Sequence, residues 1–208
     1  MKIALRSVAG HSAHIRFITK QESSEIADFD GEPSEITLRY ENEAPRLLCG
    51  LGDRESCTAH ILRSAAAKAI QKVADLKRDQ VSMVIPILPT LKGDEAALCA
   101  EGALLGSYRF EKYKSDKKPA IKSLELVGKA DTRRIREVEA LCSAVNYTRD
   151  LVNDNAEVVT PQLLAAEIAS LGQRAKMKTT ILDEKAIRRE NLRMLAAVGR
   201  GSPTPPRL

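Results

Sequence analysis

Two histidines three positions apart, His11 and His14, are the first side chains in the sequence with the types and spacing of metal ligands. An H-x-x-H pair suits two zinc ligands when both lie on one face of a helix. The surrounding residues instead have the apolar alternation and turn formers of strands. The third histidine, His60, is distant in sequence, and no further ligand is near the pair. We therefore expect solvent-facing polar residues here and no metal site.

A glycine-rich step, Cys49-Gly50-Leu51-Gly52-Asp53, joins a predicted strand to a predicted helix. Backbone amides at such a turn, followed by a helix N-terminus, can hold a phosphate. A lone G-x-G without a third glycine does not complete a dinucleotide fingerprint. The favoured interpretation is a tight strand-to-helix turn, with phosphate binding as the alternative.

The four cysteines, Cys49, Cys57, Cys99 and Cys142, are scattered along the chain and form no C-x-x-C pair. This spacing does not suit a zinc ribbon or a redox motif. We expect them to be small buried hydrophobic residues in a reducing compartment. The sequence also contains no Ser/His/Asp set, nucleophile elbow or Walker loop. Local patterns alone thus indicate an α/β protein without an identifiable catalytic group.

Composition is compatible with a globular protein slightly longer than one typical domain. The chain has 208 residues, of which 43% are hydrophobic and 29% charged, and its formal net charge is +5. No apolar run approaches the ~20 residues that a membrane span needs. The start of the chain lacks a signal-type apolar stretch, so we expect a cytoplasmic protein.

The densest basic stretch, residues 112–118, lies beside Pro119 and has the composition of a solvated loop. Binding of nucleic acid usually requires a whole basic face, preferably with stacking aromatic residues. Aromatic residues make up only 3% of this chain. Nucleic-acid binding is therefore a minor alternative, and neither nucleic acid nor a membrane is an expected partner.

Strand-like and helix-like segments alternate along the first two thirds of the chain. Strands are predicted at 2–8, 13–20, 35–41, 45–50, 81–85 and 121–127. Helices are predicted from Ser56, as N-cap, to Leu76, from an Asp94 cap to about Phe110, and from about Thr132 to Asn153. This alternation predicts a layered α/β domain, and the hairpin-like early strands predict a mixed sheet. In the second of these helices, small residues including Gly102 and Gly106 would allow close approach of a neighbour.

The last third begins with a well-specified helix. Thr160 is a suitable N-cap and Pro161 suits the first helical position. Val159 can pack on Leu164 as a hydrophobic staple. Leu164, Ile168 and Leu171 are the predicted buried face, with Gly172 at the end. We then expect a strand at 178–182, a short charged helix at 183–190, an apolar segment at 191–198 that is either helix or strand, and a final loop.

Polar residues between the last two long helices are not explained by helix signals alone. Asn153, Asp154, Asn155 and Glu157 follow one helix and precede the Thr160 cap. Their side chains can bond free backbone groups at a helix end. Either this segment becomes buried in a larger assembly, or it is an ordinary exposed turn.

Four segments in sequence order resemble the cytosolic leucyl aminopeptidases, the two-metal M17 peptidases. "RDLVNDNAEVVTP" (149–161) is similar to that family's R-D-L-x-N segment and its V-x-T-P step. "NLRMLAAVGRGSPTPPRL" (191–208), "EGALLGSYRFEKYK" (101–114) and "CGLG" (49–52) resemble three further family segments. The matches cover about residues 48–208, whereas the first 45 residues match only in their pattern of strands.

The resemblance implies a mixed-sheet, layered, macro-domain-like N-terminal domain at 1–130. It further implies a linker helix at 131–153 and the truncated start of a zinc-peptidase α/β domain at 154–208. Family members remove N-terminal residues from peptides, leucine preferentially, with two divalent ions, zinc or manganese, and typically form homohexamers. Peptides are thus the expected substrates of the full-length enzyme.

The family's metal-ligand motifs follow the P-P-R-L match, so none of them falls on this chain, which is 208 residues long. The resemblance therefore assigns no catalytic, cofactor-binding or metal residue here. Val127-Gly128-Lys129-Ala130-Asp131 begins like the family's lysine motif, but the remainder of that motif is missing. We assign this segment to a turn and a helix cap. The resulting hypothesis is a non-catalytic portion with roles in scaffolding, oligomerisation and active-site access. The alternative is a macro-like module that binds a nucleotide, ADP-ribose or nucleic acid.

Overall fold

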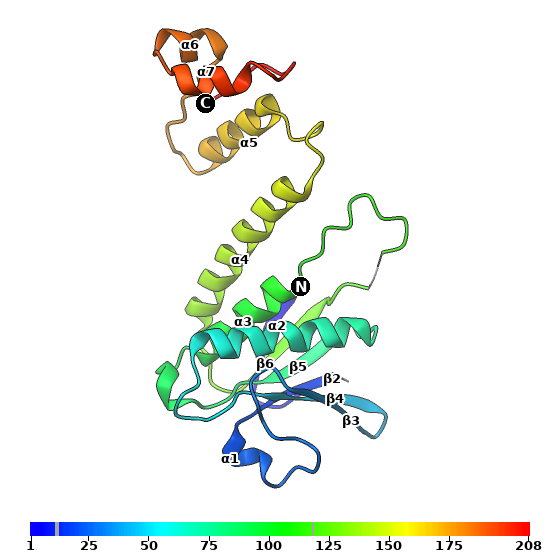
Figure 1. Cartoon of the computed structure of the whole chain (residues 1–208). Helices are drawn as coiled ribbons and strands as arrows, with labels where there is room; N and C mark the ends of the chain where they lie inside the picture. Colours follow the sequence, from blue (N-terminus) through cyan, green and yellow to red (C-terminus); the bar gives the residue numbers. More distant parts are fainter. Residues whose placement is uncertain (11–12, 118) are drawn as a thin grey trace. The chain divides into compact units, whose positions relative to one another are not determined.

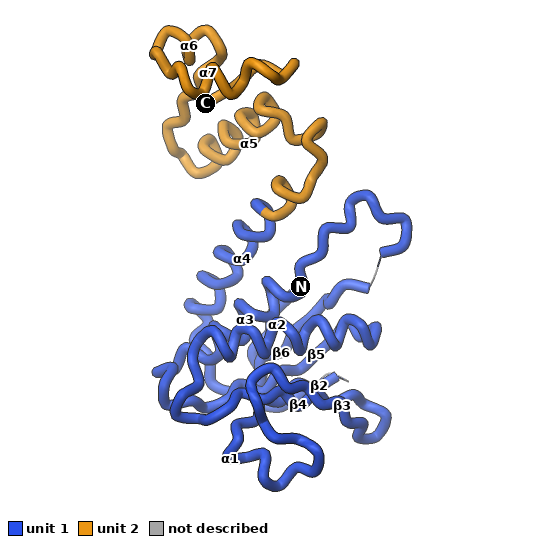
Figure 2. The backbone as a smooth tube through the Cα atoms, viewed as in Figure 1, with its two compact units in different colours: residues 1–148 blue, residues 149–208 orange. Residues whose placement is uncertain are grey.

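A computed structural model describes residues 1–10, 13–117 and 119–208 of the chain. These residues divide into two compact units, Met1–Thr148 and Arg149–Leu208, shown in separate colours in Figure 2. No helix of the described residues is both long and apolar enough to cross a bilayer. The prediction for His11 concerns a residue outside this described part of the chain.

The first unit is built on a six-stranded sheet with the strand order β1-β6-β5-β2-β4-β3. The strands are β1 (Lys2–Arg6), β2 (Ala13–Ile18), β3 (Ile36–Glu41), β4 (Ala44–Gly50), β5 (Gln80–Val84) and β6 (Ser123–Val127). Every neighbouring pair is parallel except β3 and β4, which are antiparallel. The predicted mixed sheet is confirmed, and its antiparallel part is a single hairpin.

The β3–β4 hairpin has a two-residue turn at Asn42 and Glu43. Both residues have positive φ, 49° and 64°. This is the pattern of a type I′ turn, whose twist matches that of the flanking strands. The register pairs Glu41 with Ala44 and continues to Ile36 with Cys49.

Helices α2 (Ala59–Asp75) and α3 (Glu95–Gly106) lie together on one face of the sheet (Figure 1). The remaining elements of this unit are α1 (Lys20–Ser23), the 3-10 turn η1 (Pro89–Leu91) and most of α4 (Thr132–Asn153). α4 has the predicted bounds, whereas α3 ends at Gly106 rather than near Phe110. Ile135, Val138 and Cys142 of α4 join the same hydrophobic core as the sheet and α2.

The start of α2 corrects one prediction. Its N-cap is Thr58, whose hydroxyl accepts from the Ile61 amide at 3.3 Å, and not Ser56. The Ser56 hydroxyl instead contacts the Asp53 carbonyl at 3.4 Å. Both are capping residue types, so sequence alone did not separate them. Residues 53–56 continue the turn that leaves β4, which moves the helix start by two positions.

Gly102 lets α2 and α3 approach closely. A Cβ placed on Gly102 would lie 2.3 Å from the Arg63 carbonyl oxygen and 2.9 Å from the Ala66 Cβ. These separations are shorter than any real contact, so no other residue fits without moving a helix. The predicted close approach through small residues is confirmed.

The second unit contains α5 (Pro161–Arg174), α6 (Glu184–Arg189) and α7 (Arg193–Gly199) after the last residues of α4. Thr160 caps α5 as predicted, with its hydroxyl accepting from the Leu163 amide at 3.3 Å. The helix continues past Gly172 to Arg174. For residues 191–198 the sequence allowed either helix or strand, and the structure has helix α7 there.

Besides the helix end at Gly172, two further predictions for this unit are wrong. Residues 178–182 do not form a strand. Leu164, Ile168 and Leu171 are not buried: their exposed fractions are 39%, 46% and 38%. The apolar face of α5 therefore has the predicted composition but lacks a covering layer within its own unit.

Candidate functional site

The Gly50–Gly52 turn has no free backbone amide for a phosphate. The Gly50 amide donates to Glu35, the Leu51 amide to Ile18 and the Gly52 amide to Gly31, all at 2.8–2.9 Å. A Cβ on Gly50 would lie 2.1 Å from the Glu32 carbonyl oxygen. The close contact explains this glycine as a packing requirement. This is the tight strand-to-helix turn that the sequence favoured, and the amides of Gly50, Leu51 and Gly52 are not available to bind a phosphate.

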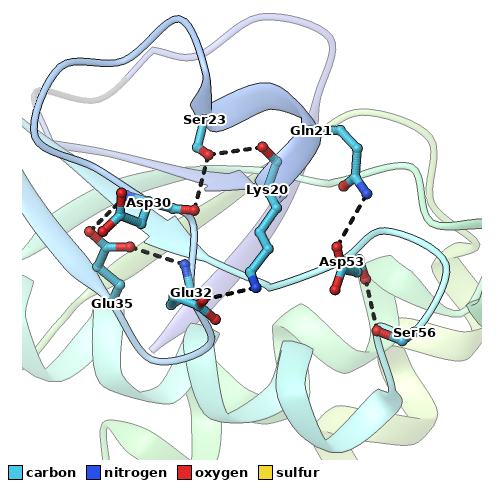
Figure 3. Close-up of polar contacts among 8 residues, drawn as sticks. All are labelled: Lys20, Gln21, Ser23, Asp30, Glu32, Glu35, Asp53 and Ser56. Atoms are coloured by element: carbon cyan, nitrogen blue, oxygen red, sulfur yellow. Dashed lines mark hydrogen bonds and ion pairs between the residues drawn. The ribbon is translucent and has the colours of Figure 1, made fainter.

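A polar network joins the loop of residues 24–35 to α1 and to itself, near this turn (Figure 3). The Glu35 carboxylate accepts from the Asp30 amide at 3.2 Å and the Glu32 amide at 3.0 Å. The Ser23 hydroxyl donates to the Asp30 carbonyl at 3.0 Å. Lys20 pairs with Glu32 at 2.8 Å, and its pKa is raised by that hydrogen bond and by the charge of Glu32. These contacts connect the loop to α1 or to itself, which indicates a structural role.

α1 was not predicted from the sequence, although its signal is present. The Glu22 carboxylate accepts from the Thr19 amide at 2.9 Å and from the Thr19 hydroxyl at 2.8 Å. This is a Thr-x-x-Glu capping box, which also serves helices too short to show periodicity.

The described residues contain no group of three or more His, Cys, Asp or Glu side chains placed to hold a metal ion. His14 is half-buried on β2 and His60 is exposed on α2. Among the described residues, neither histidine belongs to such a group. The described residues therefore do not fit a two-metal centre.

All four cysteines are free and buried, as predicted. Burial raises the pKa of Cys49 to about 12 and raises the pKa values of Cys57 and Cys99. Since the thiolate is the reactive form, burial keeps the thiols of Cys49, Cys57 and Cys99 protonated and unreactive at neutral pH. They fill space in the core between the sheet and its helices.

Glu125 is a buried carboxylate that sequence reasoning missed. It lies on β6, with a side chain 7% exposed, and Arg6 Nε is 3.4 Å from Oε1. Oε2 accepts from the Gly10 amide and from the Ser82 hydroxyl, both at 2.9 Å. The available signal was a charged residue between Leu124 and Leu126 in an apolar strand. Because its oxygens already have protein donors, it ties three chain segments together rather than binding a ligand.

The segment that resembled a lysine motif is a turn and a helix cap, as predicted. Gly128 has a φ of +134°. The Asp131 carboxylate accepts from the Arg133 amide at 2.8 Å, and the Asp131 carbonyl accepts from the Ile135 amide at 3.0 Å. These bonds satisfy donors at the start of α4.

The polar turn after α4 uses its own side chains as backbone acceptors. Asp154 Oδ1 accepts from the Asn155 amide at 2.8 Å, and Asn155 Oδ1 accepts from the Glu157 amide at 2.9 Å. The Asn155 carbonyl also accepts from the amides of Val158 and Val159. Two of the four predicted side chains, those of Asp154 and Asn155, thus bond to backbone, but the amides they accept from belong to the turn and not to a helix end. In this chain the turn is exposed.

The second unit has an open apolar groove of about 500 Å³ between α5 and the segments near 180 and 208. Its apolar lining includes Val159, Leu164, Ile168, Ile181 and Leu208. It has no cluster of titratable groups within it, so it offers contact area rather than acid–base chemistry.

Comparison with known proteins relates both units to one family. The profile of the "Cytosol aminopeptidase family, N-terminal domain" matches residues 19–117, and that of the "Cytosol aminopeptidase family, catalytic domain" matches residues 146–208. A "Probable cytosol aminopeptidase" of Aquifex aeolicus is 33% identical over 199 residues, covering 88% of this chain and 38% of the relative. A second one, from Roseiflexus castenholzii, is 35% identical over 197 residues, covering 88% of this chain and 40% of the relative. The chain thus spans about 40% of these relatives' length.

Two solved structures are also similar to this chain. The "Bottromycin maturation enzyme BotP in complex with Mn" has a TM-score of 0.79 and 27% identity, over 94% of this chain and 44% of that one. A tomato leucine aminopeptidase mutant has a TM-score of 0.82 over 100% of this chain and 49% of its own, at 22% identity, which shows the fold alone. Both family domains match in order, and the relatives carry the family's name. The chain therefore belongs to the cytosol aminopeptidase family, with its N-terminal domain followed by part of its catalytic domain.

Proposed function

We propose that the complete protein is a metal-dependent aminopeptidase that hydrolyses N-terminal residues, leucine preferentially, from peptides. The observation that carries this proposal is the ordered match of both family domains, at residues 19–117 and 146–208. The matched relatives are named as probable cytosol aminopeptidases. Within this proposal the chain itself is non-catalytic and contributes scaffolding, oligomer contacts and control of active-site access.

The proposed division places the N-terminal domain at 1–130, the linker helix at 131–153 and the start of the catalytic domain at 154–208. The continuous helix α4, Thr132–Asn153, supports a single connecting element between the two parts. The proposal also includes a cytoplasmic location and a homohexameric assembly of the complete enzyme.

Two divalent ions, zinc or manganese, are the proposed cofactors of the complete enzyme. The manganese complex of a structural relative supports metal dependence. The described residues of this chain do not fit such a centre, because no three potential ligands come together among them. No step of the reaction is therefore assigned to a residue of this chain.

A chimera tests the proposal directly. Residues 1–208 replace the matching segment of the Aquifex aeolicus relative, and hydrolysis of leucine-p-nitroanilide is measured with Mn²⁺. We expect an active, EDTA-sensitive chimera and no turnover by the 208-residue chain alone. A chimera that melts cooperatively but is inactive would contradict the scaffold role. Turnover by the chain alone would place the metal centre within it and would equally overturn the proposal.

A further inference from the structure

A small recess lies between the last turns of α2 and the end of α3 in the first unit. Its volume is about 130 Å³, and its lining comes from α2, from the end of α3 and from the segment that leads to β6. The end of α3 is pressed against α2, because a Cβ on Gly106 would lie 2.6 Å from the Ala67 Cα. A more open outer recess shares Gln71, Gly106, Arg109 and Glu111 with it and gives access from solvent.

Arg109 lines the recess and has a hydrogen-bonding group without a partner. Its Nη1 atom is buried and has no acceptor among the described residues. The other terminal nitrogen, Nη2, lies 4.0 Å from Asp75 Oδ1, at the outer limit of an ion pair. A buried donor without an acceptor is unfavourable, and a carboxylate matches the planar guanidinium in charge and geometry. The recess therefore has an unused donor for a carboxylate.

Glu111 contributes the opposite charge to the same lining. Among the described residues, its carboxylate makes no hydrogen bond or ion pair. The C-terminal end of α3 at Gly106 also lines the recess, and the end of a helix carries partial negative charge. Both features favour an ammonium group. The recess thus combines one group that binds an anion with groups that bind a cation.

The wall between these charges is apolar. Ile70, Ala74 and Ile121 line it and are 0%, 5% and 5% exposed. A volume of about 130 Å³ holds roughly ten water-sized groups, which is close to the size of leucine. Sites for larger ligands such as nucleotides usually have volumes of about 300–1,000 Å³. The size and lining therefore suit a small molecule with an aliphatic part.

We propose that this recess binds a free α-amino acid with an aliphatic side chain of about the size of leucine. The Arg109 guanidinium binds the carboxylate, Glu111 and the end of α3 bind the ammonium group, and the apolar wall contacts the side chain. A zwitterion is favoured over a simple carboxylate or a simple amine, because each of these would leave one lining charge without a partner.

Such a site would be a second place for the residue that the complete enzyme releases. It is separate from any metal centre, since the described residues contain no group of three potential metal ligands. The identity of the ligand as a reaction product rests on the proposed function. The recognition of a zwitterion rests on the recess alone and is measured without turnover, so its failure is distinct from failure of the proposed activity.

A titration of the 208-residue chain with L-leucine, followed by NMR, tests the proposal. We expect saturable shifts of the Gly106, Ser107 and Ile121 amides, with a dissociation constant of about 1 mM or below. Leucinamide lacks the carboxylate and 4-methylpentanoate lacks the ammonium group, and each is expected to bind at least about tenfold more weakly. Absence of saturable shifts up to about 20 mM leucine would overturn the proposal. Binding of either analogue as tight as that of leucine would overturn it equally.

A matched pair of variants tests the role of Arg109. Arg109→Gln is expected to weaken leucine binding by at least about tenfold, because the carboxylate loses its charged donor. Arg78→Gln removes the same charge from an exposed position just after α2, outside the lining, and is expected to leave binding unchanged. Equal weakening in both variants, with thermal melts like that of the unsubstituted chain, would show that Arg109 acts only through overall charge and would contradict the site.

Glu111→Gln separates recognition of the ammonium group from a structural effect. We expect it to weaken leucine binding by at least about threefold and to leave the weaker binding of 4-methylpentanoate unchanged or improved, since that ligand has no ammonium group. Equal weakening for both ligands would mean that the substitution distorts the recess and would remove Glu111 from the site. An unchanged affinity for leucine would likewise contradict the proposed zwitterion geometry.

Discussion

Individual residues in the first unit show how a sheet face tolerates a buried acid. Glu125 lies in register with Ser82 on β5, and its neighbours Leu124 and Leu126 point into the core on the other face. The Ser82 hydroxyl, the Gly10 amide and Arg6 surround the carboxylate. A buried acceptor with several donors is costly to remove, because each abandoned donor loses its partner.

We predict that Glu125→Ala lowers the free energy of unfolding by about 2–4 kcal/mol, since the buried Ser82 hydroxyl and the Gly10 amide lose their acceptor. Urea denaturation followed by circular dichroism measures this loss. Glu41→Ala is the control: Glu41 is 59% exposed and pairs with Arg46, and a surface pair contributes about 0–1 kcal/mol. Equal effects of the two substitutions would show that the Glu125 contacts contribute little.

Cys49 makes stability depend on pH in the alkaline range. Burial raises the pKa of this thiol from its ordinary value of 9.0 to about 12. Above pH 9.0 the unfolded chain loses the proton while the folded chain keeps it, so the free energy of unfolding falls as pH rises toward 12. Each fully titrating group contributes at most about 1.4 kcal/mol per pH unit.

We therefore expect Cys49→Ala to have a shallower decline in the free energy of unfolding above about pH 9 than the unsubstituted chain. The measurement is a series of urea titrations at increasing pH. Comparing slopes rather than absolute stabilities removes the separate cost of the smaller side chain. Identical slopes would mean that the Cys49 thiol titrates normally in the folded state.

At the scale of elements, the structure shows which of two capping residues, Ser56 or Thr58, begins α2. Thr58 accepts a bond from a helical amide, whereas Ser56 contacts a carbonyl of the preceding turn. We expect Thr58→Ala to destabilise the chain by about 1 kcal/mol and Ser56→Ala to have little effect. Thermal unfolding of the two variants measures the difference. A larger loss at Ser56 would restore the sequence-based assignment.

The α2–α3 contact depends on the absence of a side chain at Gly102. Alanine favours helix by about 1 kcal/mol over glycine, yet its Cβ would overlap the Arg63 carbonyl. We expect the overlap to dominate, so Gly102→Ala should destabilise by about 1–3 kcal/mol. Gly201→Ala, which meets nothing within 4 Å, is the matched control. Stabilisation by Gly102→Ala would mean that the helices can separate without cost.

At the scale of the whole molecule, the two units differ sharply in burial. The first contains the contiguous hydrophobic core, whereas Gly172 and Ile187 are the buried residues of the second unit. Local stability follows buried apolar contact, because ordering the chain has a large entropic cost. The second unit is therefore the less stable part of this chain.

Two helices with equivalent caps allow a direct comparison. α2 and α5 each begin at a threonine whose hydroxyl accepts at 3.3 Å, but α2 has seven buried residues and α5 has one. We predict that amides in the middle of α5 exchange at least about 100-fold faster than those in α2. Native-state hydrogen exchange measures this ratio. Similar protection of both helices would show that α5 is stabilised by contacts other than burial.

The sequence by itself determined most local elements. Periodicity and turn residues located the strands, and α4 has its predicted bounds, because these signals act between residues close along the chain. It also determined the burial of the cysteines and the Thr160 cap. The family resemblance came from short ordered segments, which the comparison confirmed.

Tertiary structure decided whatever depends on partners distant in sequence. Glu125 became buried because Ser82, Gly10 and Arg6 come together around it, and no local pattern specifies that meeting. The apolar stripe of α5 and the predicted strand at 178–182 had the right composition, but neither a buried face nor a strand exists without a neighbour to cover or pair with it. Composition sets what a segment can pair with, and only the folded chain shows whether that neighbour is present.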